Sequence, residues 1–386
     1  MVMIKDKSII IAIPIICGLT AANMYYIQPL FLMISKSIGI TYVQSTNLFT
    51  AQLVGNVLSL ILFIPVADVI DRRKIIGSLY VCLCTGLFLV YFSTNFNILL
   101  GGYALIGVGA SSVPLIIAFY NKEEKHENII GYIMGGVLLG IIGSRFASGI
   151  LSNFLGWRGI YIVSFFLMLL GASFILKNMK PNSENKENNI NYFSVMHSNI
   201  MATLEDRSVR LYCFYSFATM FSFTAFWTNI ATYLDQSLDF STTEIALFSL
   251  LGVSGALVAI YAPAITGSIF TTSLRLFMTG IALLACAIAL PNSLIWLGGF
   301  TALFDALIQL IHVSNQKKLY SRSKGKEAQA ASNYMTFFML GGAVGGFTSS
   351  IVYTTSSWNG VLTMCLGLFL LMVIIEKKSM PNIKSN

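Results

Sequence analysis

Long apolar stretches recur along the whole chain, and they restrict the fold more than any other feature of the sequence. A hydrocarbon core about 30 Å thick requires roughly 20 apolar residues per spanning helix. With 56% hydrophobic residues and a mean hydropathy of +0.75, the 386-residue chain is too apolar for a water-soluble domain. We therefore expect an all-α membrane protein with twelve transmembrane helices. Their approximate spans are 9–33, 44–67, 75–93, 97–119, 129–154, 159–177, 210–234, 243–265, 273–290, 293–316, 329–353 and 359–376.

The basic residues indicate how these helices are oriented. The net charge is +8, with 24 Lys and Arg against 16 Asp and Glu. Lys36 and Arg158 fall in loops on one side and Arg145 falls within a helix, which leaves the other 21 basic residues on the opposite side. Lys and Arg accumulate on the cytoplasmic face of membrane proteins. We therefore expect a protein of the bacterial cytoplasmic (inner) membrane with both termini on the cytoplasmic side. The basic balance therefore indicates orientation in a lipid bilayer and not binding of nucleic acid.

The sequence offers no support for catalysis. Its six cysteines all fall inside apolar stretches, and no loop combines Cys and His at the spacing of a metal site. It lacks the Gly-rich Lys loop of ATP-hydrolysing proteins. We expect no disulfide, no metal, no cofactor and no enzymatic activity.

A polar segment divides the chain into two halves of six helices each. Residues 178–208 are rich in Asn, Ser, Lys and Glu, a composition typical of a cytosolic linker. We therefore expect an N-terminal bundle over residues 1–177 and a C-terminal bundle over residues 209–386.

Weak internal similarity relates the two halves. At an offset of 201 residues, Trp157 pairs with Trp358 and Gly140 pairs with Gly341. Ordered similarity of this kind is expected of a duplicated six-helix unit.

The charged stretch "PVADVIDRRKII", residues 65–76, directly follows the second apolar stretch. Together with the twelve spans and the linker after the sixth, it resembles the major facilitator superfamily over nearly the whole chain. That family carries a loop signature of the form G-x-x-x-D-[RK]-x-G-x-[RK]-[RK]. Three residues match signature positions (Asp68, Arg73 and Lys74), and three depart from them (Ile64, Val69 and Asp71).

The resemblance implies a conformational latch at this loop. In the family, the loop latches the two halves together when the cavity faces outward. In this chain the latch residues would be Asp68, Arg72, Arg73 and Lys74. The alternative is a charge cluster that only keeps the loop in the cytosol.

A second resemblance lies in the fifth span. Exporters of the family tend to carry G-x8-G-x3-G-P-x2-G-G there, and this chain keeps Gly131, Gly140 and Gly149 in register but lacks the proline. These glycines would let helices approach closely and seal the interface between the two halves against leakage. The alternative is glycine-rich helix packing that says nothing about the direction of transport. The stretches "AANMYYIQPLF" and "GSRFASGILSNFLGWRGIY" are also similar to a bacterial branch of drug:proton antiporters or sugar-efflux-like transporters.

Two ionisable residues lie deepest in the spans. A charge at mid-bilayer costs about 3 kcal/mol or more, so Arg145 and Asp305 each suggest a function. We expect them on facing walls of one cavity, where Asp305 would exchange its proton as the Arg145 charge approaches or recedes. The alternatives are a permanent structural ion pair, or two separate groups tied to backbone carbonyls.

The tenth span carries a polar stripe. Asp305, Gln309, His312 and Gln316 follow one another at i, i+4, i+7 and i+11, which puts them on one helical face. His312 is a candidate proton relay because imidazole titrates near neutral pH. The alternative for His312 is a fixed hydrogen bond.

By analogy with the family, the first, fourth, seventh and tenth helices line a central cavity. The candidate wall residues are Asn23, Tyr26, Phe226, Asn229, Asp305 and Gln309. We predict a monomeric secondary active transporter that works by alternating access, exchanging protons for a small organic solute or drug-like amphipathic compound that it exports. Import or uncoupled facilitation of a small solute is the first alternative, and a non-transporting membrane receptor is the second.

Overall fold

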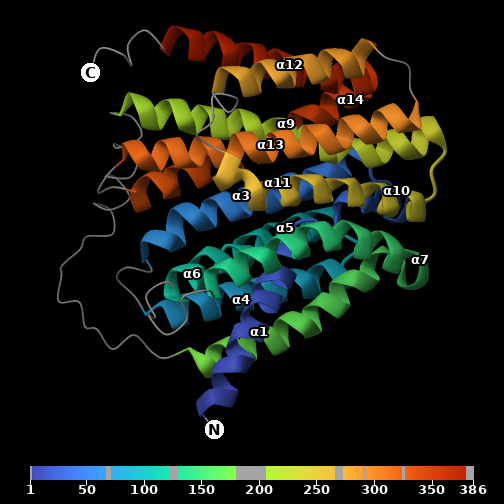
Figure 1. Ribbon diagram of the computed structural model, residues 1–386. Coiled ribbons are helices and arrows are strands. Elements are labelled where there is room, and N and C mark those ends of the chain that lie inside the picture. The colour runs from blue at the N-terminus through green and yellow to red at the C-terminus, as the bar shows by residue number, and fades with distance from the viewer. Residues whose placement is uncertain are drawn as a thin grey trace. The chain divides into compact units, whose positions relative to one another are not determined.

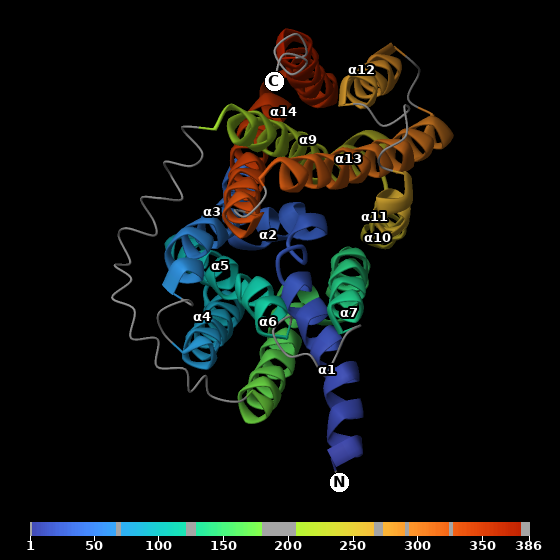
Figure 2. The same ribbon diagram turned by 60° about the vertical axis from the view of Figure 1, so that its left-hand side comes forward.

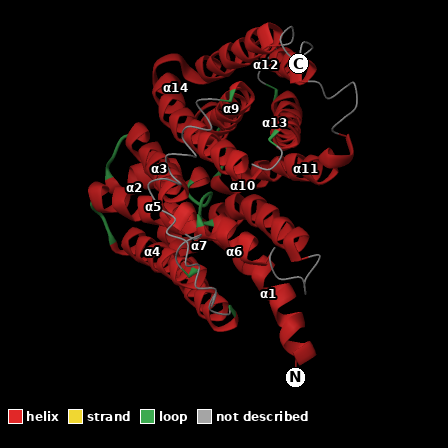
Figure 3. Ribbon diagram, turned by 90° about the vertical axis from the view of Figure 1, so that its left-hand side faces the viewer, coloured by secondary structure: helices red, strands yellow, loops and turns green. Residues whose placement is uncertain are grey.

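The computed structural model describes residues 2–66, 71–120, 129–179, 206–265, 273–289, 293–323 and 327–379. Within these ranges the regular elements are helices, and none is a strand (Figure 3). Each apolar stretch is helical in most of its described part, so the expected all-helical architecture is confirmed. Seven segments of the described chain are long and apolar enough to cross a membrane, and two shorter apolar helices accompany them.

The described residues group into two compact units. In the first unit α1 packs along α7, α5 packs against α3 and α4, and α10 packs on α7 (Figures 1 and 2). Its helices are α1 (Val2–Ala22), η1 (Gln28–Leu30), α2 (Phe31–Ile38), α3 (Tyr42–Val66), α4 (Arg72–Phe92), α5 (Phe96–Ala110), α6 (Ser112–Tyr120), α7 (Ile129–Asn178) and α10 (Thr242–Phe248).

In the second unit α9 packs along α14, α11 packs against α13, and α12 packs against both α13 and α14. Its helices are α9 (Arg207–Leu238), α11 (Val253–Ile265), α12 (Ser273–Ala289), α13 (Leu294–Arg322) and α14 (Glu327–Ser379). A short 3-10 helix, η2 (Ser249–Gly252), connects α10 to α11 along the chain. The eighth predicted span therefore divides: its first part, α10, belongs with the first unit, and α11 belongs with the second.

The duplication predicted from the sequence is visible in equivalent helix contacts. A Cβ added at Gly140 on α7 would run into the backbone of Gly18 on α1, and one added at Gly341 on α14 would run into the backbone of Phe217 on α9. The paired glycines thus allow the same close approach in each unit.

The helices α7 and α14 are long because each contains two predicted spans joined by a one-residue turn. α7 has 50 residues and leaves helical geometry at Gly156 (φ 68°, ψ 171°). α14 has 53 residues and does so at Ser357 (φ 56°, ψ −163°). These positions are again 201 residues apart, and each directly precedes one of the paired tryptophans. This backbone region is essentially restricted to glycine, so Ser357 is strained by about 1–3 kcal/mol.

Replacing Ser357 by glycine is expected to raise the midpoint of thermal unfolding, because glycine adopts this geometry without the strain of about 1–3 kcal/mol. The matched change Gly156→Ser should lower the midpoint by a comparable amount. Circular dichroism of the helical signal, recorded on both purified variants during heating, measures the difference. A midpoint for Ser357→Gly below that of the unmodified protein would contradict the strain.

Candidate functional site

The first predicted span is interrupted where it passes α7. α1 ends at Ala22, residues 23–27 form turns, and η1 begins at Gln28 with Pro29 next to it. Backbone groups released by such a break need partners in a membrane protein. The carbonyl of Asn23 accepts a hydrogen bond from Gln52 Nε2 on α3, at 2.8 Å. The break is therefore stabilised from within the unit.

Asn23, predicted as a cavity wall, fastens this break. Its side chain is 1% exposed. Its Nδ2 donates to the Leu19 carbonyl at 2.8 Å, and its Oδ1 accepts from Ser164 Oγ on α7 at 2.7 Å. Tyr26, also predicted as a wall residue, is buried at 4% exposure. Asn23 thus ties α1 to α3 and α7 through backbone and side chain together.

Arg145 lies against the same break. It projects from α7, is 3% exposed, and donates from Nε to Gln28 Oε1 at 2.6 Å. Its guanidinium carbon is 5.2 Å from the centroid of the Tyr25 ring, a favourable distance for a cation–π contact. Two neutral groups of the first unit, an amide and a ring, thus contact this cation.

Gln28 is a functional candidate that the predicted wall set omitted. Arginine only donates hydrogen bonds, so the oxygen of the Gln28 amide must face Arg145 and the nitrogen must point elsewhere. Gln28 is 2% exposed, and its Nε2 has no hydrogen-bond partner within the described part of the chain. A buried donor beside a buried cation favours a ligand or water that offers acceptor oxygens.

Asp305 occupies a comparable position in the second unit. It lies on α13, is 3% exposed, and accepts a hydrogen bond at Oδ1 from Trp227 Nε1 on α9, at 2.9 Å. Its Oδ2 lies against Gly255 on α11, where an added Cβ would run into that oxygen and come within 2.9 Å of Gln309 Cγ. Ser254 Oγ donates to the Ala302 carbonyl at 2.7 Å and holds α11 close to α13. Three helices of one unit therefore enclose this acid.

The remaining members of the polar stripe on α13 separate along the helix. Gln309 is half-buried near Asp305. His312 lies seven residues from Asp305, about 10 Å along the axis, and its Nδ1 is 3.2 Å from the Tyr334 hydroxyl on α14. The His312 and Phe338 ring centroids are 4.3 Å apart. The structure thus supplies the fixed hydrogen bond that the sequence left as an alternative, and the relay role stays a prediction.

The two wall candidates on α9 make contacts within their own unit. Phe226 is 1% exposed. Four aromatic rings have their centroids within 5.7 Å of its ring centroid: those of Trp227, Phe300, Phe304 and Trp358.

Asn229 is fully buried. Its Nδ2 donates to the Ala225 carbonyl at 2.8 Å and to Ser349 Oγ on α14 at 2.9 Å. The role of Phe226 and Asn229 as a substrate wall stays a prediction.

The latch loop is described only in part, because Asp68 lies outside the described residues. Arg72 is buried at 9% exposure, Arg73 is half-buried and Lys74 is exposed. Asp71 precedes α4 and accepts a hydrogen bond from the Arg73 backbone N–H at 3.0 Å. It therefore caps the helix. The family signature has a glycine at this position, so comparison with the signature did not predict this role.

The three predicted glycines of the fifth span have different surroundings. Gly140 contacts α1, as described above, and an added Cβ at Gly149 would lie 2.6 Å from the Ala246 Cβ on α10. Near this second contact Asn153 Nδ2 donates to Thr243 Oγ1 at 2.9 Å. A Cβ at Gly131 would meet no atom within 4 Å. Two of the three glycines thus allow close helix packing.

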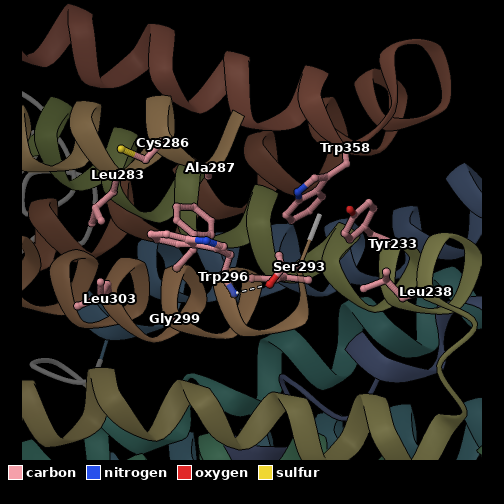
Figure 4. A pocket seen from close by; sticks show the side chains of 12 residues that line it. Tyr233, Leu238, Leu283, Cys286, Ala287, Ser293, Trp296, Gly299, Leu303 and Trp358 are labelled. Carbon is pink, nitrogen blue, oxygen red and sulfur yellow. Dashed lines mark hydrogen bonds between the residues drawn. The ribbon is translucent and has the colours of Figure 1, made fainter. Parts of the chain in front are cut away.

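A cavity of about 120 Å³ lies within the second unit, between α9, α12, α13 and α14 (Figure 4). Aromatic and aliphatic side chains line most of it, and none of the predicted site residues does. Elsewhere, within the described ranges, no group of three or more His, Cys, Asp or Glu side chains is arranged to hold a metal ion.

Known transporters are similar to this chain over most of its length. Residues 15–318 match the family described as Major Facilitator Superfamily. The uncharacterized transporter YgaY of Escherichia coli O157:H7 is 27% identical over 363 residues, which cover 92% of this chain and 91% of the relative. The inner membrane transport protein YnfM of Escherichia coli K12 is 24% identical over 363 residues, which cover 92% of this chain and 85% of the relative.

Solved structures share the fold. The nucleoside transporter NupG has a TM-score of 0.77 at 13% identity, covering 95% of this chain and 98% of that chain. The human organic anion transporter MFSD10 (TETRAN) has a TM-score of 0.68 at 15% identity, covering 95% and 97%. The helical fold and the family match together show that the chain is a multi-pass membrane transporter and belongs to the Major Facilitator Superfamily.

Proposed function

We propose that this transporter works by alternating access and exports a small organic solute or drug-like amphipathic compound in exchange for protons. The proposed location is the bacterial cytoplasmic membrane with both termini inside, which the distribution of basic residues supports. Asp305 is the proposed proton-exchanging group, and Arg145 is the proposed cation that favours its release.

The environment of Asp305 carries the proposal. A charge within a spanning helix costs about 3 kcal/mol or more, so a buried acid there suggests a function. The indole N–H of Trp227, 2.9 Å from Oδ1, can donate to that oxygen in a carboxylate and in a neutral carboxyl group alike. The hydrogen bond from Trp227 is therefore compatible with both protonation states of Asp305, as proton exchange requires.

Arg145 supplies the change that would drive proton release. A positive charge near an acid favours the ionised form. Arg145 belongs to the first unit and Asp305 to the second, and alternating access moves one unit against the other. In the proposed cycle the separation of the two charges changes with this motion, so release of the proton is linked to reorientation of the cavity.

Export is the proposed direction for two reasons. The stretches around residues 21–31 and 143–161 resemble bacterial drug:proton antiporters, and Gly140 and Gly149 sit in close helix contacts of the kind expected from an exporter's fifth helix. The missing proline of that signature favours the competing function, an importer or an uncoupled facilitator. Uridine is a suitable probe for that alternative because one transporter of similar fold is named for nucleosides.

Flux through purified protein in liposomes separates these functions. Ethidium and uridine are offered as probes, with and without an imposed pH gradient. Movement of a probe against its own gradient, driven by protons moving the opposite way, supports the proposal. Movement that ignores the pH gradient indicates a facilitator, and movement in the same direction as the protons indicates a symporter.

Asp305→Asn is expected to abolish proton-driven transport and to retain exchange of solute down its own gradient. The amide keeps the size of the side chain and an oxygen that accepts from Trp227, but it has no proton to release. Flux in liposomes under a pH gradient measures the loss. Asp235→Asn, at the end of α9, is the matched control and should behave as the unmodified protein. Full proton-driven flux in Asp305→Asn would refute the coupling role.

Gly255→Ala is expected to lower proton-driven flux about tenfold, because overpacking against Asp305 costs about 1–3 kcal/mol. Gly298→Ala provides the control, since its new Cβ would only come within 3.5 Å of Leu251 Cδ1, an ordinary contact. The same liposome assay measures both variants, and their thermal unfolding midpoints show whether each remains folded. Equal flux in the two variants would show that the close approach of α11 to Asp305 does not affect proton-driven transport.

A further inference from the structure

We propose that the cavity in the second unit binds the end of one acyl chain of a membrane phospholipid. The cavity has a buried floor and an exposed rim. Tyr233, Phe300 and Trp358 form the floor, each at 7% exposure or less. Trp296 and Leu303, at 55% and 58% exposure, belong to the rim. The opening therefore lies on the outer surface of a helical unit that crosses the membrane.

Exposed apolar side chains on membrane-spanning helices contact lipid hydrocarbon. Leu303 lies nine residues after the start of α13 at Leu294, about 14 Å along the helix axis. Leu283 lies six residues before the end of α12 at Ala289, about 9 Å from that end. The rim around Leu303 is therefore deep enough to face acyl chains and not headgroups.

The hydroxyl groups of the lining lie at one end of the cavity, beside the apolar side chains of Leu238 and Trp358. Figure 4 shows Ser293 and Tyr233, which bear hydroxyl groups, at one side and Leu283, Leu303 and Cys286 at the other, with Trp296 between them. The hydroxyl-bearing side coincides with the ends of α9 and α12 and the start of α13, where Trp and Tyr typically meet the membrane interface. The exposed Leu303 lies at the opposite side, so a chain end that enters past Leu303 and Trp296 reaches the floor at Tyr233 and Trp358.

The size of the cavity fits part of a chain. Its volume of about 120 Å³ is close to the roughly 150 Å³ of an engineered apolar cavity in another protein that binds benzene. Gly299 lines it, and an added Cβ there would meet no atom within 4 Å. A larger side chain at this position can therefore fill the space without displacing the protein.

A transported solute is the less suitable occupant. None of the ionisable or amide groups proposed for transport lines the cavity, and the lining is mostly hydrocarbon and aromatic. Such a surface offers few directional contacts to a polar solute. It is suited to the acyl chains of the lipids that surround the unit in the membrane.

Quenching of tryptophan fluorescence by brominated phosphatidylcholine tests the proposal. The protein is reconstituted in vesicles of this lipid and of its unbrominated form, and comparison with Trp358→Phe isolates the emission of Trp358. The Trp358 ring is only 5% exposed, so lipid outside the cavity has little contact with it. Quenching requires near contact with the ring, and we therefore expect a brominated chain end in the cavity to reduce that emission by roughly half. Trp157 is the matched reference. It is the repeat partner of Trp358, is 3% exposed, and does not line the cavity. Its emission should not change.

A second pair of variants keeps all tryptophans in place. Gly299→Leu should fill the cavity and reduce the quenching of total emission. Gly367→Leu, on α14 with equally open surroundings and away from the cavity, should leave the quenching unchanged. Trp358 emission that is insensitive to brominated lipid, or quenching of the same size in Gly299→Leu and Gly367→Leu, would overturn the proposal. Quenching that ethidium displaces would assign the cavity to a transported compound and overturn it as well.

Discussion

The structure depends on one constraint: a bilayer cannot hydrogen-bond to the backbone, so a spanning chain can leave helical geometry only where protein groups replace the lost bonds. The break after Ala22 follows this rule. At residues 23–27 the Gln52 amide bonds the carbonyl of Asn23, and the Asn23 side chain is itself held by Ser164. Gly156 and Ser357 instead lie between predicted spans, where each turn is confined to a single residue. Asn23, the polar residue at the break within the first predicted span, therefore also fastens α1 to its neighbours.

The same constraint explains how much of the site could be predicted. The helical spans follow from apolar length alone, and the repeat at an offset of 201 residues, seen as paired glycines and tryptophans, recurs in the structure as paired helix contacts and paired turns. Arg145 and Asp305, the ionisable residues predicted to lie deepest in the spans, are both buried in the protein.

The partners of those residues could not be predicted. Whether a polar side chain in a spanning helix lines a cavity or fastens a neighbour depends on how the helix is rotated in the bundle, and both uses favour the same residue types. Asn229 was predicted as a wall residue and bonds Ser349 on α14; Gln28 was left out of the wall set and bonds Arg145. Asp71 could have been recognised, since an Asp directly before a basic and apolar helix start is an ordinary N-cap signal, but the family signature drew attention to a missing glycine instead.

Arg145 and Asp305 each have a neutral partner within their own unit. Within the first unit a neutral amide and a tyrosine ring contact Arg145, and within the second a neutral indole bonds Asp305. Leaving a buried charge without any compensating group costs about 3–5 kcal/mol, a barrier that would oppose any motion that separated the units. In the cycle proposed above, a neutral partner from the same unit would reduce that cost for Arg145, and for Asp305 whenever it is ionised. The same partners hold the geometry within each unit, and the proposed coupling therefore requires no change in local structure around Arg145 or Asp305.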